Sequence, residues 1–174
     1  MGYSPLLFLG DFTGDGVDDI LVSIVSGGSG GITYYYIFTD TNNVPMMIFD
    51  YNIFNNFYKY DVIYRDNYKA EVINRTLNTS FIIDLNYKGK QYLDEIYYSN
   101  GKLKKPINGF VNGLSGLYPV DFDSNGVYEL LGYQKIAGQY NADSLGYIQT
   151  SLKWDGRVFV PFDQMVAVEG MDNG

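Results

Sequence analysis

Two loops of the same design constrain this chain more than any other feature of its sequence. The first, Asp11–Asp19, reads Asp-Phe-Thr-Gly-Asp-Gly-Val-Asp-Asp, and the second, Asp121–Glu129, reads Asp-Phe-Asp-Ser-Asn-Gly-Val-Tyr-Glu. They align without a gap, start 110 residues apart, and are each followed by an aliphatic pair. Because self-similarity at a long spacing is typical of repeat architectures, the sequence predicts a fold built from repeated units.

Oxygen-bearing residues stand at alternate steps of both loops, where they can converge on one point. Hard divalent cations prefer several oxygen ligands of this kind. The predicted ligands of the first loop are Asp11, Thr13, Asp15, the Val17 carbonyl and Asp19, with Gly16 at the bend. Those of the second loop are Asp121, Asp123, Asn125, the Val127 carbonyl and Glu129, with Gly126 at the bend. We therefore predict up to two structural Ca²⁺ sites.

Two other interpretations compete with the calcium sites. An EF-hand places a Glu at the twelfth loop position, between two helices, whereas the twelfth residues here are Val22 and Gly132. A turn that binds nothing is the second alternative. It would hold the carboxylates of Asp11, Asp15, Asp18 and Asp19 close together with no cation to offset their repulsion.

The composition favours strands throughout the chain. Aromatic residues make up 17% of it, including 18 tyrosines and 11 phenylalanines, and such residues are enriched in β-sheets. We therefore expect an all-β fold, without amphipathic helices, as a single repeat domain over residues 1–174. The predicted strands of the first unit (5–57) are 6–12, 19–25, 32–38 and 44–50. Those of the middle unit (58–112) are 59–65, 69–75, 79–86 and 92–103, and those of the last unit (113–174) are 117–122, 128–136, 146–154 and 157–168.

The middle unit contains a reduced version of the loop. Asp66 lies halfway between the other two loops, but the segment around it is shortened and lacks the glycine and the central carboxylate. We interpret it as a plain hairpin turn.

Several classes of function are disfavoured by what the chain lacks. It contains no His and no Cys, which removes Ser-His-Asp and Cys-His catalysis and the zinc sites built from these residues. A net charge of −8 disfavours nucleic-acid binding. We find no signal peptide and no apolar run long enough for membrane insertion. The chain is therefore more readily a binding module than an enzyme.

The loops, followed by aliphatic pairs, resemble the calcium loops of FG-GAP and VCBS-type repeat proteins, which include the propellers of integrin α-subunits. The resemblance implies four-stranded propeller blades, each with an ion in the hairpin between its first two strands. Because propellers have four to eight blades, three blades would form a partial propeller or one completed by another chain. At three ligand steps this chain departs from aspartate: Thr13 and Asn125 are weaker ligands, and Glu129 is a longer one.

Three functions follow as expectations. The first is a noncatalytic calcium-binding module of an exported or cell-surface protein, used for adhesion or for binding a protein or carbohydrate ligand. The second is a hydrolase or accessory domain acting on polysaccharide through carboxylates such as Asp61, Asp94, Glu95 or Asp143. The third is a scaffold that completes a propeller by self-association.

Overall fold

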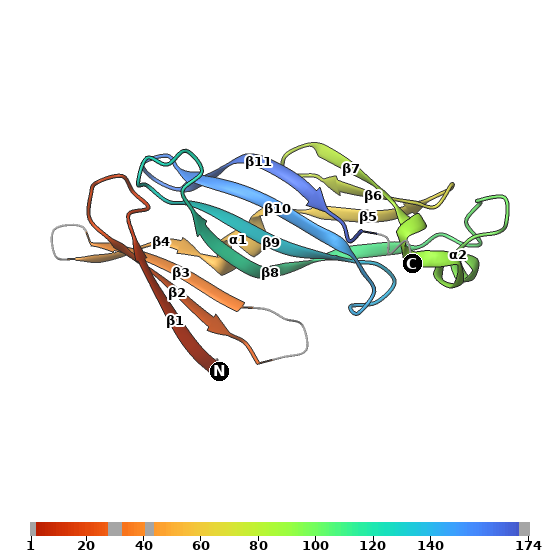
Figure 1. Cartoon of the computed structure of the whole chain (residues 1–174), viewed down its shortest axis with the longest axis horizontal. Coiled ribbons are helices and arrows are strands. Elements are labelled where there is room, and N and C mark those ends of the chain that lie inside the picture. The colour runs from red at the N-terminus through yellow and green to blue at the C-terminus, as the bar shows by residue number, and fades with distance from the viewer. Residues whose placement is uncertain (1–2, 28–32, 41–43, 171–174) are drawn as a thin grey trace. The chain divides into compact units, whose positions relative to one another are not determined.

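The chain folds mainly into β-strands, which confirms the expected all-β class (Figure 1). The computed structural model describes residues 3–27, 33–40 and 44–170. The strands in this part of the chain are β1 (Tyr3–Gly10), β2 (Asp19–Val25), β3 (Thr33–Asp40), β4 (Pro45–Asp50), β5 (Tyr60–Arg65), β6 (Lys69–Asn74), β7 (Thr79–Asp84), β8 (Asn108–Val120), β9 (Glu129–Ala137), β10 (Ser144–Trp154) and β11 (Phe159–Ala167). The helices are α1 (Tyr51–Phe57), the 3₁₀ turn η1 (Leu85–Lys88) and α2 (Gly89–Ile96).

Strands β1 to β4 form one antiparallel four-stranded sheet, drawn in red to orange in Figure 1. The register aligns Phe8 with Leu21, Leu21 with Ile37, and Ile37 with Phe49. Since successive side chains of a strand point to opposite faces, these apolar residues share one face, and the last three are buried. The predicted four strands of the first unit are therefore confirmed.

The remaining strands form a single seven-stranded sheet in the order β11-β10-β9-β8-β5-β6-β7. The predicted arrangement as three separate four-stranded blades is wrong, because the second and third units share this sheet. Strand β5 pairs with β8 through Val62↔Gly109 and Ile63↔Asn108. This pairing merges the two predicted units.

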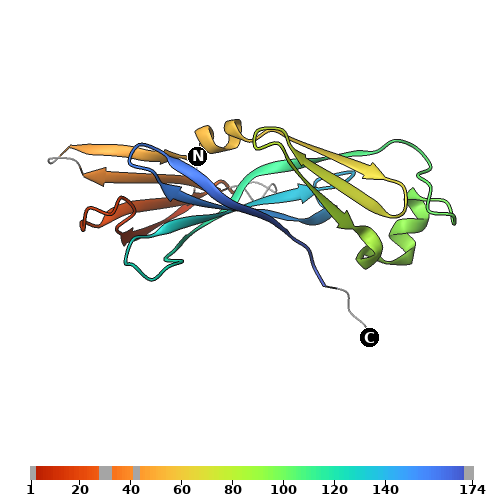
Figure 2. The same cartoon turned by 90° about the horizontal axis from the view of Figure 1, so that it is seen from above.

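A helix stands where the fourth strand of the middle unit was predicted. Residues 92–103 include the end of α2, and Tyr97↔Leu103 is an isolated bridge. In Figure 2, η1 and α2 follow β7. The half-buried Tyr92 and Leu93 and the buried Ile96 lie three to four residues apart, as on one face of a helix. The expectation that the chain lacks amphipathic helices was therefore wrong. None of the helices that the structure describes is long and apolar enough to cross a membrane.

The chain divides into two compact units, and neither is a continuous segment. Unit 1 contains residues 1–56, 113–134 and 149–165, and unit 2 contains residues 57–112, 135–148 and 166–174. In unit 1, the rings of Phe12 and Phe49 both contact Phe159. The core of unit 2 is formed by residues such as Val62, Val72, Ile83, Leu85, Ile96, Ile136 and Leu145.

Candidate divalent-cation loops

Both predicted loops lie in unit 1, where each joins two neighbouring antiparallel strands. Residues 11–18 connect β1 to β2, and residues 121–128 connect β8 to β9. The backbone N–H of Tyr128 donates to the carbonyl oxygen of Asp11 at 2.7 Å. This hydrogen bond ties the end of the second loop to the start of the first.

The two loops share three of their hydrogen bonds. At the first step, Asp11 Oδ2 accepts from the backbone N–H of Gly16 at 2.8 Å, and Asp121 Oδ2 accepts from Gly126 at 3.0 Å. At the fifth step, the side chains of Asp15 and Asn125 each accept from the backbone N–H two residues later, at 2.9 and 2.7 Å. At the ninth step, Asp19 Oδ2 accepts from Phe12 N at 2.8 Å, and Glu129 Oε2 accepts from Phe122 N at 3.1 Å.

The backbone conformations match as well. The fourth and sixth steps have positive φ in both loops, at Gly14 (79°) and Gly16 (82°), and at Ser124 (60°) and Gly126 (89°). Left-handed conformations suit glycine and are strained for other residues. Ser124 nevertheless adopts the conformation of Gly14, so the two loops are structural repeats despite their different residues.

Three carboxylates converge in the second loop. Oxygen atoms of Asp121, Asp123 and Glu129 all lie within 4.8 Å of one another. These residues occupy the first, third and ninth steps, and the equivalent residues of the first loop are Asp11, Thr13 and Asp19. The first loop therefore has a hydroxyl where the second has its middle carboxylate.

That hydroxyl is the clearest sign of an incomplete set of contacts. Thr13 Oγ1 is buried and has no hydrogen-bond partner among the described residues. Leaving a buried polar atom unsatisfied costs about 1–3 kcal/mol, so such atoms are rare. A cation bound among the oxygens of Asp11, Thr13 and Asp19 would supply the missing contact, and the donor set therefore fits Ca²⁺.

The loops differ in how deeply they are buried. Asp19 and Phe12 are both buried, and the Phe12 ring also lies 6.0 Å from that of Tyr128. The equivalent Glu129 is only half-buried, and Phe122 is 47% exposed, with its ring 5.7 Å from Phe162. The first loop is therefore anchored in the core by Phe12 and Asp19, whereas the equivalent residues of the second loop lie nearer the surface.

The reduced loop near Asp66 is a hairpin turn, as predicted. It joins β5 to β6, which pair from Arg65↔Lys69 onward. Asn67 and Tyr68 both have positive φ, at 62° and 58°, as in the tight turns that suit antiparallel hairpins. The Asp66 carboxylate accepts the backbone N–H of Leu103 at 2.9 Å, so it acts as a structural acceptor.

A separate polar cluster lies in unit 2 around Asp143, whose side chain is only 1% exposed. Its Oδ1 pairs with Lys88 Nζ at 3.0 Å. Its Oδ2 accepts from Tyr92 Oη at 2.9 Å, from Tyr64 Oη at 3.2 Å and from Gln139 N at 3.0 Å. Every oxygen of this carboxylate is thus satisfied, and the cluster fastens residues 139–143 to α2 and β5.

The cluster also changes proton affinities. Burial alone raises the pKa of the Asp143 carboxyl, but hydrogen bonds from Gln139, Lys88 and Tyr92 outweigh it and lower the pKa below its usual value. Burial raises the pKa of Tyr92 well above its usual value. The carboxylate therefore stays ionised and its tyrosine partner stays protonated at neutral pH, which is the arrangement of a stable structural ion pair.

The carboxylates considered for hydrolysis are mostly held by cations. Asp61 pairs with Arg75 at 2.5 Å, Asp94 pairs with Lys90, and Asp143 pairs with Lys88. Glycoside hydrolysis needs two carboxyls facing each other across a cleft. These three are instead engaged by separate partners. The hydrolase function remains a prediction that draws no support from these contacts.

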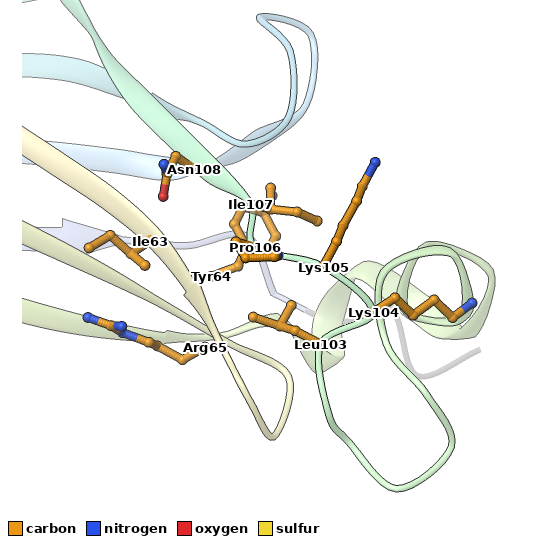
Figure 3. Close-up of a pocket in the computed structure, with 9 residues that line it drawn as sticks. All are labelled: Ile63, Tyr64, Arg65, Leu103, Lys104, Lys105, Pro106, Ile107 and Asn108. Atoms are coloured by element: carbon orange, nitrogen blue, oxygen red, sulfur yellow. The ribbon is translucent and has the colours of Figure 1, made fainter.

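A pocket of about 410 Å³ lies in unit 2, between β5 and the segment that precedes β8 (Figure 3). Its lining includes the apolar Ile63 and Ile107 and the cationic Arg65, Lys104 and Lys105. Arg65 pairs with Glu71 at 2.6 Å, and Lys104 Nζ donates to the Asp94 carbonyl at 2.5 Å. Figure 3 shows the three cationic side chains pointing in different directions. The three side chains do not converge on one point where an anion could bind.

Comparison with known proteins assigns the chain to a family. A model described as the YybI C-terminal domain matches residues 58–167. The chain belongs to the YybI C-terminal domain family. The predicted membership of the FG-GAP and VCBS-type repeats is wrong, because the family that matches is the YybI C-terminal domain. The second loop lies inside the matched region, and the first loop lies before it.

The YybI match extends over almost the whole chain. The uncharacterized protein YybI of Bacillus subtilis (strain 168) is 56% identical over 172 residues, which are 99% of this chain and 66% of that protein. The chain thus spans slightly less than two thirds of the length of its relative. No solved structure matches it.

Proposed function

We propose that this chain is a noncatalytic module that binds two structural Ca²⁺ ions, one in each loop. The observation that carries the proposal is the buried Thr13 Oγ1 with no hydrogen-bond partner. It stands at the step where the second loop brings Asp123 close to Asp121 and Glu129. An oxygen that is unsatisfied in one repeat and part of an acidic cluster in the other supports a shared ligand.

The predicted ligands of each loop would bind one ion. Asp11, Thr13, Asp15 and Asp19 would bind it in the first loop, together with the Val17 carbonyl. Asp121, Asp123, Asn125 and Glu129 would bind it in the second, together with the Val127 carbonyl. Bound calcium supplies positive charge that offsets carboxylate repulsion.

The hydrogen bonds of each loop prepare these ligands. The backbone N–H groups of Gly16 and Gly126 orient the first Asp of each loop, and those of Phe12 and Phe122 orient the ninth-step carboxylate. Because the ninth residue begins the next strand, ligand binding at both ends of a loop would hold two strands together. This would stabilise the β1–β2 and β8–β9 pairs.

The setting of the module follows from the expected affinity. Asp15, Asp123 and Asn125 are exposed, and we expect weak binding, with dissociation constants of about 10⁻⁴–10⁻³ M, the range of extracellular calcium modules. Such an affinity fits an exported or cell-surface protein. Adhesion and ligand binding remain predictions, since they rested on the family resemblance.

Thermal unfolding tests the proposal. The chelator-treated chain is compared with and without calcium, and calcium at a hundredfold excess over the dissociation constant stabilises the folded state by about 2.7 kcal/mol per site. Asp15→Ala and Asp123→Ala should each lose part of this gain. Asp163→Ala removes an exposed carboxylate outside the loops and should keep all of it. A midpoint that calcium leaves unchanged would refute the proposal.

A further inference from the structure

The seventh and eighth steps of the second loop lie against the first loop. These two residues, Val127 and Tyr128, are half-buried. Their equivalents in the first loop, Val17 and Asp18, are exposed. A Cβ atom added at Gly14 would lie 3.7 Å from Cγ2 of Val127, so this side chain reaches the fourth step of the first loop. The burial of the second loop at these steps therefore comes with a contact to the first.

The ring of Tyr128 packs beside the first ligand step of the first loop. Its centroid lies 5.1 Å from that of Phe8 and 6.0 Å from that of Phe12. A Cβ atom added at Gly10 would lie only 2.8 Å from Cδ2 of the same ring, so the glycine leaves room for it. Since Gly10 and Phe12 flank Asp11, the ring is held against both neighbours of this predicted ligand.

A single peptide group connects the two loops at this point. The Val127 carbonyl is a predicted ligand of the second loop. The N–H of the same peptide group belongs to Tyr128 and donates to the Asp11 carbonyl at 2.7 Å. The group is trans, and a planar trans peptide points its C=O and its N–H in opposite directions. A group that directs its N–H to the first loop therefore directs its carbonyl away from that loop.

We propose that this peptide group couples the two calcium sites, so that an ion bound in either loop raises the affinity of the other loop. The inference rests on the proposed function, since it concerns the same two ions. An ion on the Val127 carbonyl would fix the plane of the group, and with it the N–H that holds Asp11. Polarising the carbonyl also strengthens the hydrogen bond of the attached N–H. Because coupling between two sites is reciprocal, each ion favours the other by the same factor.

Calorimetric titration of the whole chain with calcium measures the coupling. Asp123→Ala gives the association constant of the first loop alone, and Asp15→Ala gives that of the second loop alone. The coupling factor is the overall two-ion constant of the parent divided by the product of these two constants. We expect a factor of about five, the size that one hydrogen bond can supply. Salt at about 0.15 M screens repulsion between ions that lie farther apart than about 8 Å.

Two further variants test the contact while keeping every predicted ligand. Tyr128→Ala removes the ring that holds the peptide group against the first loop. Its two-ion constant should fall about fivefold, whereas its first-ion constant should stay unchanged, which a general loss of structure would not produce. Phe162→Ala removes the ring contact between β11 and Phe122 of the second loop and should leave both constants unchanged. Circular dichroism checks that both variants keep the fold.

The outcomes separate the coupling from calcium binding itself. Two ions that bind with a coupling factor of one or less would overturn the coupling and leave the two calcium sites in place. A two-ion constant that Tyr128→Ala leaves unchanged, or that Phe162→Ala lowers equally, would also overturn it. A chain that binds no calcium would overturn both the coupling and the proposed function.

Discussion

The predicted ligands of the two loops include the same number of carboxylates but place them differently. Each set has three carboxylates and one neutral side-chain oxygen, which is at the third step in the first loop (Thr13) and at the fifth step in the second (Asn125). Their backbone hydrogen bonds nevertheless match. The two loops therefore share the acceptors at the first, fifth and ninth steps and the glycine bend, whereas the positions of their charged and neutral side chains differ.

The largest expected difference between the loops comes from their phenylalanines. Phe12→Ala removes a fully buried ring that contacts Phe8, Tyr128 and Phe159, and it should lower the free energy of unfolding by about 3–5 kcal/mol. Phe122→Ala should cost about 1 kcal/mol, because that ring is about half exposed. Urea unfolding without calcium measures both. Equal losses would contradict the difference in burial.

A smaller difference is expected at the ninth step. Asp19→Ala leaves the buried N–H of Phe12 without its acceptor, which should lower the free energy of unfolding by about 1–3 kcal/mol. Glu129→Ala exposes the Phe122 N–H to water instead and should cost less than about 1 kcal/mol. The same denaturant titration compares the two variants. A larger loss of unfolding free energy for Glu129→Ala than for Asp19→Ala would contradict the difference in burial between the two carboxylates.

The smallest expected change in stability comes from Thr13→Val, which replaces the unsatisfied hydroxyl with a methyl group of similar size. Without calcium, the variant should be as stable as the parent or more stable by about 1 kcal/mol. Its calcium affinity should fall about tenfold, because one ligand is lost. Calorimetric titration measures the affinity, and Thr79→Val, at an exposed strand position, is the control. An unchanged affinity would exclude Thr13 as a ligand.

Features set by short stretches of sequence could be predicted well. The glycine bends and alternating acceptors predicted the positions of both loops, and the strands of the first unit and β9 to β11 followed from local runs of aromatic and β-branched residues. Strand β8, by contrast, begins at Asn108, well before the predicted strand 117–122. The turn at Asp155 was also local: its carboxylate accepts the backbone N–H of Arg157 and Val158, and Asp155 N donates to Val158 O.

Features that depend on distant residues could not be predicted. The pairing of Val62 with Gly109 decides that one sheet replaces two blades, and no local pattern indicates it. The partners of Asp143 are equally remote, since Tyr92 and Tyr64 lie 51 and 79 residues away. The FG-GAP resemblance failed for a related reason: a nine-residue loop specifies a local backbone conformation, but not the sheet in which it lies.

Calcium stoichiometry tests the central claim most directly. Isothermal titration of the chelator-treated chain should give two ions per chain. Asp15→Ala and Asp123→Ala should each retain one, and the double variant should retain none. A chain that binds no calcium, or single variants that still bind two ions with unchanged affinity, would contradict the assignment of these loops as calcium sites.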